Sequence, residues 1–484
     1  MEQQEQEPGR RSGLPEGRVC AVKKLRKIGK VLLVIVLVLA FVYGVASLIL
    51  GRRFAAAIEK VKAAGDPVSV ATLGGEPVPD AENAAIIYEK VFKRLGSANG
   101  KKQLNVLDCV PAKDGASNVW TGTGDASTSG FSKEVMDSPT FWSDAKKAGA
   151  YFSDVLPMVE QAVARPKCKF DTRWQDGFGA LFPQYGRLRQ LDRLLCAQAI
   201  LLARDGKTDE AYQTLELAFK VAKTTCNDPI LIAVLVKCAL NRMANEALLD
   251  VMKYGAPNAR QAEALNSMLD TTDYGPDFAS AMKGERAAGL WAYDYVRATG
   301  TTDAVNATTG SGSASPSRWV GKLLRFGWRP ILYADGVVYL DYMNKQVEAA
   351  SLPYRSGKQK QIDQSFGRLP RYAILARIIL PVFTRARLSV DAARAETALA
   401  QVVLAAQQYK AQTGAYPASL EELSAKMGRN LPEDPFSGKD LVYKRDGKGF
   451  QVYSISGNLR DDGGVPRKEH GERDSGDMVV FWTH

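Results

Sequence analysis

The amino-acid sequence predicts a mainly α-helical protein, with a single N-terminal transmembrane helix, a helical, repeat-like ectodomain and a small α+β domain at the C-terminal end. Three observations predict this fold class. Residues 31–50 form an uncharged apolar run, apolar residues recur at spacings of three and four along much of the chain, and short strands joined by a tight turn occur near the C-terminal end. A chain of 484 residues is long enough for several domains, each with its own core.

The apolar run over 31–50 is the predicted transmembrane helix. Twenty residues of α-helix span about 30 Å, the thickness of the hydrocarbon core of a bilayer. Residues 1–30 carry eight Lys and Arg side chains and form a basic tail, whereas few basic residues follow the run. Because basic flanks stay in the cytoplasm, we expect a cytoplasmic N-terminus and a body outside the cytoplasm. A cleaved signal peptide is the alternative, although no small-x-small cleavage pattern directly follows the run.

The formal net charge of the chain is +11. Part of the excess lies in residues 318–394, which hold fourteen Lys and Arg against five Asp and Glu. Such a stretch can bind anionic lipid or another polyanion, but solvated helix faces are the simpler interpretation, and we favour it. No nucleic-acid-binding motif is present, so the predicted partners are the lipid bilayer, through 31–50, and a protein outside the cytoplasm.

A helical hairpin over 187–225 is the clearest element of the predicted ectodomain, which covers residues 51–380. Each helix carries an apolar stripe, and Asp205-Gly206-Lys207 forms the turn between them. The stripes are Leu188, Leu191, Leu195, Ala199 and Leu202 in the first helix, and Ala211, Leu215, Ala218 and Ala222 in the second. The pattern resembles a single tetratricopeptide-type repeat, without a second copy at the period of that family. Loops rich in Gly, Ser and Thr are predicted over 114–132 and 300–317.

Cysteines outside the predicted membrane span can form disulfides in an oxidising compartment. Cys109 with Cys168 is the pair that we would test. Cys196 and Cys238 lie in apolar helical patterns, where Cys behaves as a small hydrophobe. No C-x-x-C motif supports zinc or thioredoxin-like chemistry. Pairing stays open among Cys109, Cys168, Cys196, Cys226 and Cys238.

The C-terminal domain is predicted over 385–484. Apolar positions from Ala392 to Tyr409 step alternately by three and four residues, which indicates a long helix that ends at Thr413-Gly414. Short strands are predicted over 440–445 and 449–455, and Asp446-Gly447 forms the turn between them.

This order of elements resembles the C-terminal domain of the major pseudopilin of type II secretion systems. The matching pattern is a long helix, a G-x-Y-P-x-S-L-E-x-L segment, a D-P-F-x-G segment, a hairpin and a final Gly/Asp-rich loop. Its residues here are Gly414, Tyr416, Pro417, Leu420, Glu421, Leu423, Asp434, Pro435, Gly438, Tyr443, Tyr453, Ser454, Asp461, Asp462, Gly463, Gly464 and Asp477. The resemblance covers about the last 95 residues and implies a location in the bacterial cytoplasmic (inner) membrane, with a link to secretion or envelope assembly.

The resemblance also implies that the terminal loop binds calcium. Calcium takes six to eight oxygen ligands in irregular geometry, and this loop is rich in carboxylates. Leu459, however, stands where the family usually has a glycine. The predicted ligands are Asn458, Asp461, Asp462, Asp474 and Asp477.

The N-terminal region departs from the pseudopilin pattern. A pseudopilin is cleaved after a glycine that precedes an aromatic residue, and it carries glutamate at the fifth mature position. Here Lys30 follows Gly29, and Val34 takes the fifth position. The predicted membrane helix also lies about 340 residues before the pseudopilin-like domain. We therefore expect a protein that carries such a module rather than a filament subunit.

The sequence assigns no catalytic residues. The two histidines, His470 and His484, lie near the C-terminal end, which argues against a mechanism that needs a positioned imidazole. Carboxylates near aromatic residues, Glu285, Asp294 and Asp335, could serve a hydrolase, but carboxylates paired with arginine on helix surfaces are the favoured interpretation. The leading hypothesis is a membrane-anchored structural or interaction protein. The alternative is a membrane-tethered, carboxylate-dependent hydrolase that acts on an envelope polymer.

Overall fold

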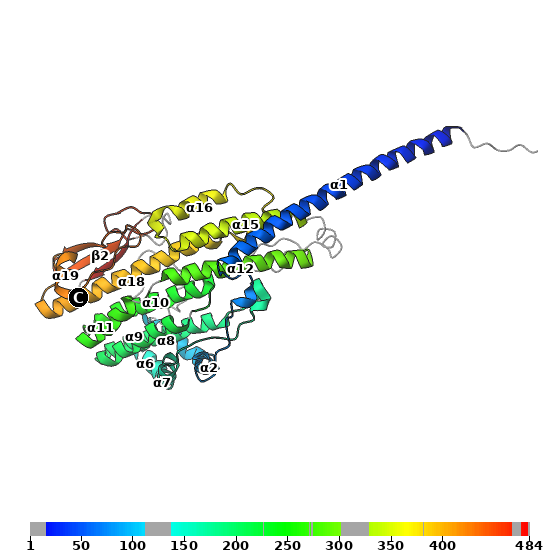
Figure 1. Ribbon diagram of the computed structural model, residues 1–484. Coiled ribbons are helices and arrows are strands. Elements are labelled where there is room, and N and C mark those ends of the chain that lie inside the picture. Colours follow the sequence, from blue (N-terminus) through cyan, green and yellow to red (C-terminus); the bar gives the residue numbers. More distant parts are fainter. Residues whose placement is uncertain are drawn as a thin grey trace, which may run out of the picture.

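The computed structural model describes residues 16–111, 137–225, 227–270, 272, 274–301, 329–380, 382–466 and 476–482. The described part is mainly helical: one long helix projects from a body of helices, and a small sheet lies at the opposite end of that body (Figure 1). The predicted loop over 114–132 and most of the one over 300–317 fall outside the described residues, as do residues 1–15 of the predicted basic tail.

Helix α1 (Glu16–Ala63) contains the predicted membrane span and continues into the body without a break. It is the one helix of the described residues that is long and apolar enough to cross a bilayer. The apolar side chains of the run are exposed, whereas Phe54 and Val61, further along the same helix, are buried. The apolar run of α1 is therefore exposed, whereas the end of the same helix is packed into the body.

The C-terminal part of α1 packs closely against α15 (Arg329–Ala350) (Figure 1). The Phe54 ring lies against Gly336, where a Cβ atom would come within 2.5 Å of it, so only glycine permits this approach. Just after α1 ends, the Asp66 carboxylate accepts a hydrogen bond from Arg286 at 2.6 Å and forms an ion pair with Lys283 at 2.8 Å. Packing and charge together hold the connector of α1 on α12 (Tyr274–Thr299).

The first part of the body consists of short helices that cover the hairpin at its centre. These are η1 (Val70–Thr72), α2 (Ala85–Leu95), α3 (Ala98–Leu107), α6 (Phe141–Tyr151), α7 (Val155–Val163) and η4 (Trp174–Gly179). The hairpin itself is formed by α8 (Pro183–Arg204) and α9 (Thr208–Thr225), which agrees with the helices and turn predicted over 187–225.

Two further helices follow the hairpin, α10 (Leu231–Met252) and α11 (Ala259–Asp270). Helix α10 packs on both helices of the hairpin and on α18 (Val382–Thr413), so it lies at the centre of the body. Between α15 and α18 the chain forms η5 (Tyr354–Ser356), α16 (Lys358–Phe366) and α17 (Ile374–Ile379).

The C-terminal sheet has three antiparallel strands in the order β1-β2-β3. The predicted hairpin is present as β1 (Val442–Asp446) and β2 (Gly449–Ser454), in a register that pairs Lys444 with Gln451. A short helix, α19 (Leu420–Met427), precedes it. Strand β3 (Met478–Trp482), which the sequence analysis did not assign, pairs with β2 and makes β2 the central strand.

The helical body and the C-terminal sheet share one core. A continuous cluster of buried apolar side chains extends from α2 through α8, α9 and α10 to α18 and the sheet. Within it, the fully buried carboxylate of Glu396 on α18 forms a two-pronged ion pair with Arg242 on α10, at 2.7 and 2.9 Å. The boundary predicted near residue 385 is therefore crossed by core packing and by a buried charge pair.

Two acidic side chains lie beside Arg242, the buried Glu396 and the half-buried Glu246. Burial raises the pKa of Glu246 to about 8, and the nearby carboxylates of Glu396 and Asp250 act in the same direction, whereas Arg242 opposes the shift. Burial also raises the pKa of Asp192 on α8 well above its usual value. Burial thus favours the protonated form of Glu246 and of Asp192.

The Glu246→Gln variant tests this arrangement through the pH dependence of stability. The folded-state pKa of about 8 exceeds the ordinary glutamate pKa of 4.5, so the folded protein holds an extra proton between these values. The contribution of Glu246 to the free energy of unfolding is therefore greatest below pH 4.5 and falls as the pH rises toward 8. We expect Glu246→Gln to reduce that slope by up to about 1.4 kcal/mol per pH unit, measured by chemical denaturation. Glu263→Gln, at an exposed position on α11, is the control and should leave the slope unchanged. An equal slope in the wild type and both variants would contradict the raised pKa of Glu246.

Candidate functional site

The loop between β2 and β3 holds the predicted metal ligands, and the described ones lie close together. The Asp461 carboxylate accepts a hydrogen bond from the Tyr453 hydroxyl at 3.0 Å and one from the backbone N–H of Gly463 at 2.8 Å. The side-chain amide of Asn458 donates to the Asp462 carboxylate at 2.8 Å. The loop thus folds back on its own side chains.

Asp477, at the end of this loop, is fully buried. One carboxylate oxygen accepts from the backbone N–H of Asp462 at 3.3 Å, and the other accepts from that of Gly464 at 2.8 Å. Burial raises the pKa of Asp477, and the carboxylates of Asp461 and Asp462 add to the shift, whereas the two N–H donors lower it. The N–H of Gly476 completes the arrangement by donating to Asp462 at 2.7 Å.

These contacts engage both carboxylate oxygens of Asp477 and one oxygen each of Asp461 and Asp462. Within the described ranges, no three His, Cys, Asp or Glu side chains are grouped so that they could hold a metal ion. Asp474, the remaining predicted ligand, lies outside those ranges. The described carboxylates fit a loop that is held by backbone N–H donors, and calcium binding stays a prediction that rests on the resemblance.

Leu459 has a left-handed backbone, with φ of 58°. This is the position at which the resemblance leads one to expect glycine, the residue that adopts such a conformation without a steric cost. The Leu459 side chain is exposed, so no core contact offsets the strain. Leu459 therefore replaces the expected glycine but keeps the left-handed backbone conformation that a glycine would favour.

Asp434, a motif residue that was not assigned a role, organises the segment before the sheet. Its buried carboxylate accepts from the Ser454 hydroxyl at 2.7 Å and from the backbone N–H of Phe436 at 3.0 Å. Its backbone carbonyl also accepts from the N–H of Gly438 at 2.7 Å. Asp434 therefore ties the 434–438 turn to the end of the central strand.

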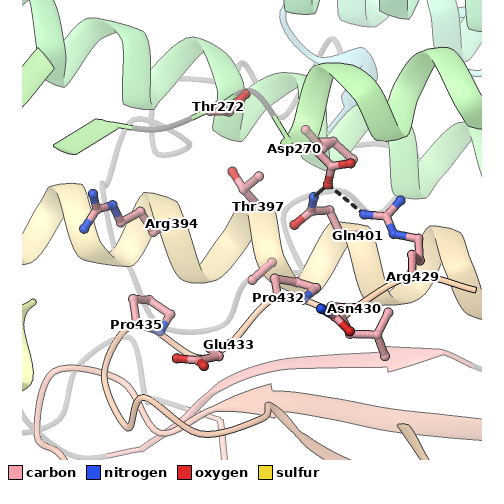
Figure 2. Close-up of a pocket in the computed structure, with 13 residues that line it drawn as sticks. Asp270, Thr272, Arg394, Thr397, Gln401, Arg429, Asn430, Pro432, Glu433 and Pro435 are labelled. Atoms are coloured by element: carbon pink, nitrogen blue, oxygen red, sulfur yellow. Dashed lines mark hydrogen bonds and ion pairs between the residues drawn. The ribbon is translucent and has the colours of Figure 1, made fainter. Parts of the chain in front are cut away.

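A pocket of about 300 Å³ lies where the helical body meets the C-terminal domain. It is lined by the end of α11, by α18 and by the segment 429–435 (Figure 2). Asp270 reaches across it and accepts hydrogen bonds from Gln401 at 2.6 Å and Arg429 at 2.7 Å. Arg394, Thr397 and Glu433 supply further polar groups around the opening.

The pocket suits a polar ligand better than an apolar one. Most small-molecule sites are lined mainly by hydrophobic and aromatic side chains, whereas this one presents guanidinium, carboxylate, amide and hydroxyl groups. Such groups are typical of the hydrogen-bonded parts of protein–protein interfaces. Sequence reasoning missed this site, because Asp270 and Arg429 are 159 residues apart.

The three carboxylates considered for a hydrolase do not come together in one site. The half-buried Glu285 side chain accepts from the backbone N–H of Leu231 at 2.8 Å, at the start of α10. Asp335 accepts from the N–H of Leu375 at 2.7 Å, at the start of α17. Both carboxylates therefore satisfy N–H groups at helix N-termini. The exposed Asp294 pairs with Arg297 at 2.7 Å, and this is the arginine-paired arrangement favoured from sequence.

The structure does not join Cys109 to Cys168. Cys109 is a buried thiol that donates a hydrogen bond to the carbonyl of Asn105 at 3.4 Å, and burial raises its pKa. Cys196, on α8, is also buried, as its apolar helical pattern predicts. Cys226 lies outside the described residues.

Comparisons with protein-family models, with curated proteins and with solved structures found no match to this chain. The resemblance to pseudopilins accordingly remains a prediction from the motif residues.

The Leu459→Gly variant tests the strain in the acidic loop. Relieving a left-handed leucine yields about 1–2 kcal/mol, and the greater freedom of glycine in the unfolded chain offsets about half of this. We expect a net stabilisation below about 1 kcal/mol, seen as a higher midpoint in thermal unfolding.

Leu181→Gly is the matched control for that variant, because Leu181 is exposed but is not among the residues with positive φ. It should lower the midpoint slightly or leave it unchanged. Equal effects at the two positions would show that the Leu459 backbone is not strained.

Proposed function

We propose that this protein is a membrane-anchored structural or interaction protein whose body lies outside the cytoplasm. In this proposal it crosses the bacterial cytoplasmic membrane once, and its C-terminal pseudopilin-like module contacts a secretion or envelope assembly. The observation that carries the proposal is α1, in which an exposed apolar stretch leads directly into a packed, glycine-fitted contact with the body.

The rigid attachment of α1 favours a scaffold over a freely tethered domain. A flexible linker would let the body turn about its anchor, whereas α1 is continuous from the apolar stretch to Ala63 and is held by Phe54, Val61 and Asp66. The body would therefore keep one orientation relative to the bilayer. A fixed orientation suits a protein that presents one surface to an assembly.

We place the partner-binding surface at the pocket between α11, α18 and residues 429–435. The pocket is open, it is built from both the helical body and the C-terminal domain, and its polar groups suit a hydrogen-bonded peptide segment. Calcium bound in the neighbouring acidic loop would stabilise that loop, but the proposed partner-binding surface does not need it.

Membrane anchoring is tested by placing a charge in the apolar run. Arginine near the centre of a membrane span costs about 2.5–3.5 kcal/mol on insertion scales, so Val36→Arg with Leu39→Arg should shift the chain out of the carbonate-resistant membrane fraction, whereas Val36→Leu with Leu39→Val should not. In spheroplasts, added protease should degrade the body of the wild-type protein but spare an N-terminal tag. A protected body would contradict the orientation, and full extraction by carbonate would contradict the anchor.

Partner binding is tested by photo-crosslinking in cells. A benzophenone amino acid at Asn430, an exposed residue of the pocket lining, should form a defined adduct with one protein. The same probe at Lys448, in the exposed β1–β2 turn, is the control and should not form that adduct. If Asp270→Ala, which removes the carboxylate from the pocket, left the Asn430 adduct unchanged, the pocket would not be the binding surface.

A further inference from the structure

The ends of α15 define which side of the body faces the apolar stretch of α1. Near the start of α15, the Tyr333 ring lies against Gly51, and its centroid is 6.1 Å from that of Phe54. At the far end of α15, the backbone carbonyls of Ala349 and Ala350 accept hydrogen bonds from Arg387 on α18. The first turns of α15 are therefore beside the end of the apolar stretch, and its last turn is remote from it.

The chain returns to this same end between α16 and α17. Helix α16 runs along α15 toward α1, and its last residue, Phe366, contacts Tyr342 with ring centroids 6.2 Å apart. Helix α17 then begins beside Asp335, whose carboxylate accepts from Leu375 and Ala376. Residues 367–374, which run from the end of α16 to the first residue of α17, thus lie at the α1-proximal end of the body, and we call them the membrane-facing turn.

The membrane-facing turn is held in one conformation, and its distance from the apolar run along α1 is short. The Arg377 guanidinium donates to the carbonyls of Leu369 and Pro370, which holds the turn on α17. Asp335, which lies on α15 and holds the start of α17, precedes Gly336, which touches Phe54. Leu50, the last residue of the apolar run, is four residues before Phe54, or about 6 Å along the helix. Because the polar head-group layer is about 5–8 Å thick on each side, the turn lies within its reach.

The chemistry of the membrane-facing turn matches that layer. Its sequence, GRLPRYAI, contains two arginines, Arg368 and Arg371, both exposed, and no acidic residue. Tyr372 and Ile374 are 46% and 43% exposed although both are large and apolar. On α15, Ile331 is 40% exposed at the same end. Arginine with exposed tyrosine and isoleucine is the composition of a membrane interface, where tyrosine is enriched and basic residues bind anionic lipid.

We propose that the membrane-facing turn binds the bilayer surface from outside the cytoplasm. Arg368 and Arg371 contact the phosphates of anionic lipids, while Tyr372 and Ile374 enter the head-group layer. The turn is thereby a second membrane contact of the body, beside the α1 span. This inference rests on the proposed function, because the bilayer reaches the turn only if α1 crosses it.

Hydrogen exchange of the full chain in lipid nanodiscs tests the proposal. Discs of phosphatidylcholine alone are compared with discs of three parts phosphatidylcholine to one part phosphatidylglycerol, with backbone exchange followed in peptides that cover 367–374. The anionic discs should slow exchange in the turn by roughly fivefold for each arginine that contacts lipid. Added salt should reduce this slowing, because it screens the charges.

Variants distinguish lipid binding from general folding. Arg368→Gln with Arg371→Gln should abolish the slowing in anionic discs. Lys426→Gln with Lys448→Gln removes two charges from exposed sites of the C-terminal domain and should leave the slowing intact. Equal exchange of the turn in both kinds of disc, or slowing that survives the double arginine variant, would overturn the proposal.

The same data separate this inference from the anchoring proposal. Protection of the amides in 31–50 reports whether α1 spans the disc. If 31–50 is protected and the turn gives no lipid-dependent slowing, α1 is the anchor and the membrane-facing turn is not a lipid contact. If 31–50 exchanges freely, the anchoring proposal fails, and the proposed role of the turn fails with it.

Discussion

The ion pair between Arg242 and Glu396 is the constraint on which the arrangement of the two halves of the chain depends. Glu396 is fully buried, and a buried carboxylate without its cation is costly, so α18 must lie where Arg242 of α10 can reach it. Helix α18 in turn carries the packing face of the C-terminal sheet. The position of the C-terminal domain on the body is therefore set from within the helical core.

The contact between α1 and the body applies a second constraint of a different kind. Phe54 fits against Gly336 through shape alone, while Asp66 is held by Arg286, which also donates to Asn344 on α15 at 2.7 Å. Since Arg286 is buried on α12, this group of contacts joins α1, α12 and α15. A force applied to the body would thus be passed to α1 through several elements.

Local patterns predicted the elements that depend on local sequence, and they failed where distant residues decide the structure. The apolar run, the α8–α9 hairpin and the β1–β2 hairpin each follow from a periodicity or turn that is complete within a few dozen residues. Strand β3 was missed because its run, MVVFW, is short and lacks alternation, and it becomes a strand only when paired with β2. The pocket joins residues 159 positions apart, and Glu285 meets Leu231 across 54 positions, distances at which a single sequence carries no signal.

The acidic loop shows why residue type alone leaves function open. Carboxylates suit calcium, but they equally suit backbone N–H donors, and both compete for the same lone pairs. In the described part of the loop, Asp477 uses each of its oxygens for one N–H group, and Asp434 likewise serves the turn before the sheet. The motif residues that suggested a family thus account for how the domain folds. What the protein does is then better sought in features outside that motif: the long apolar helix α1, the polar pocket at the junction and the basic turn beside the apolar stretch.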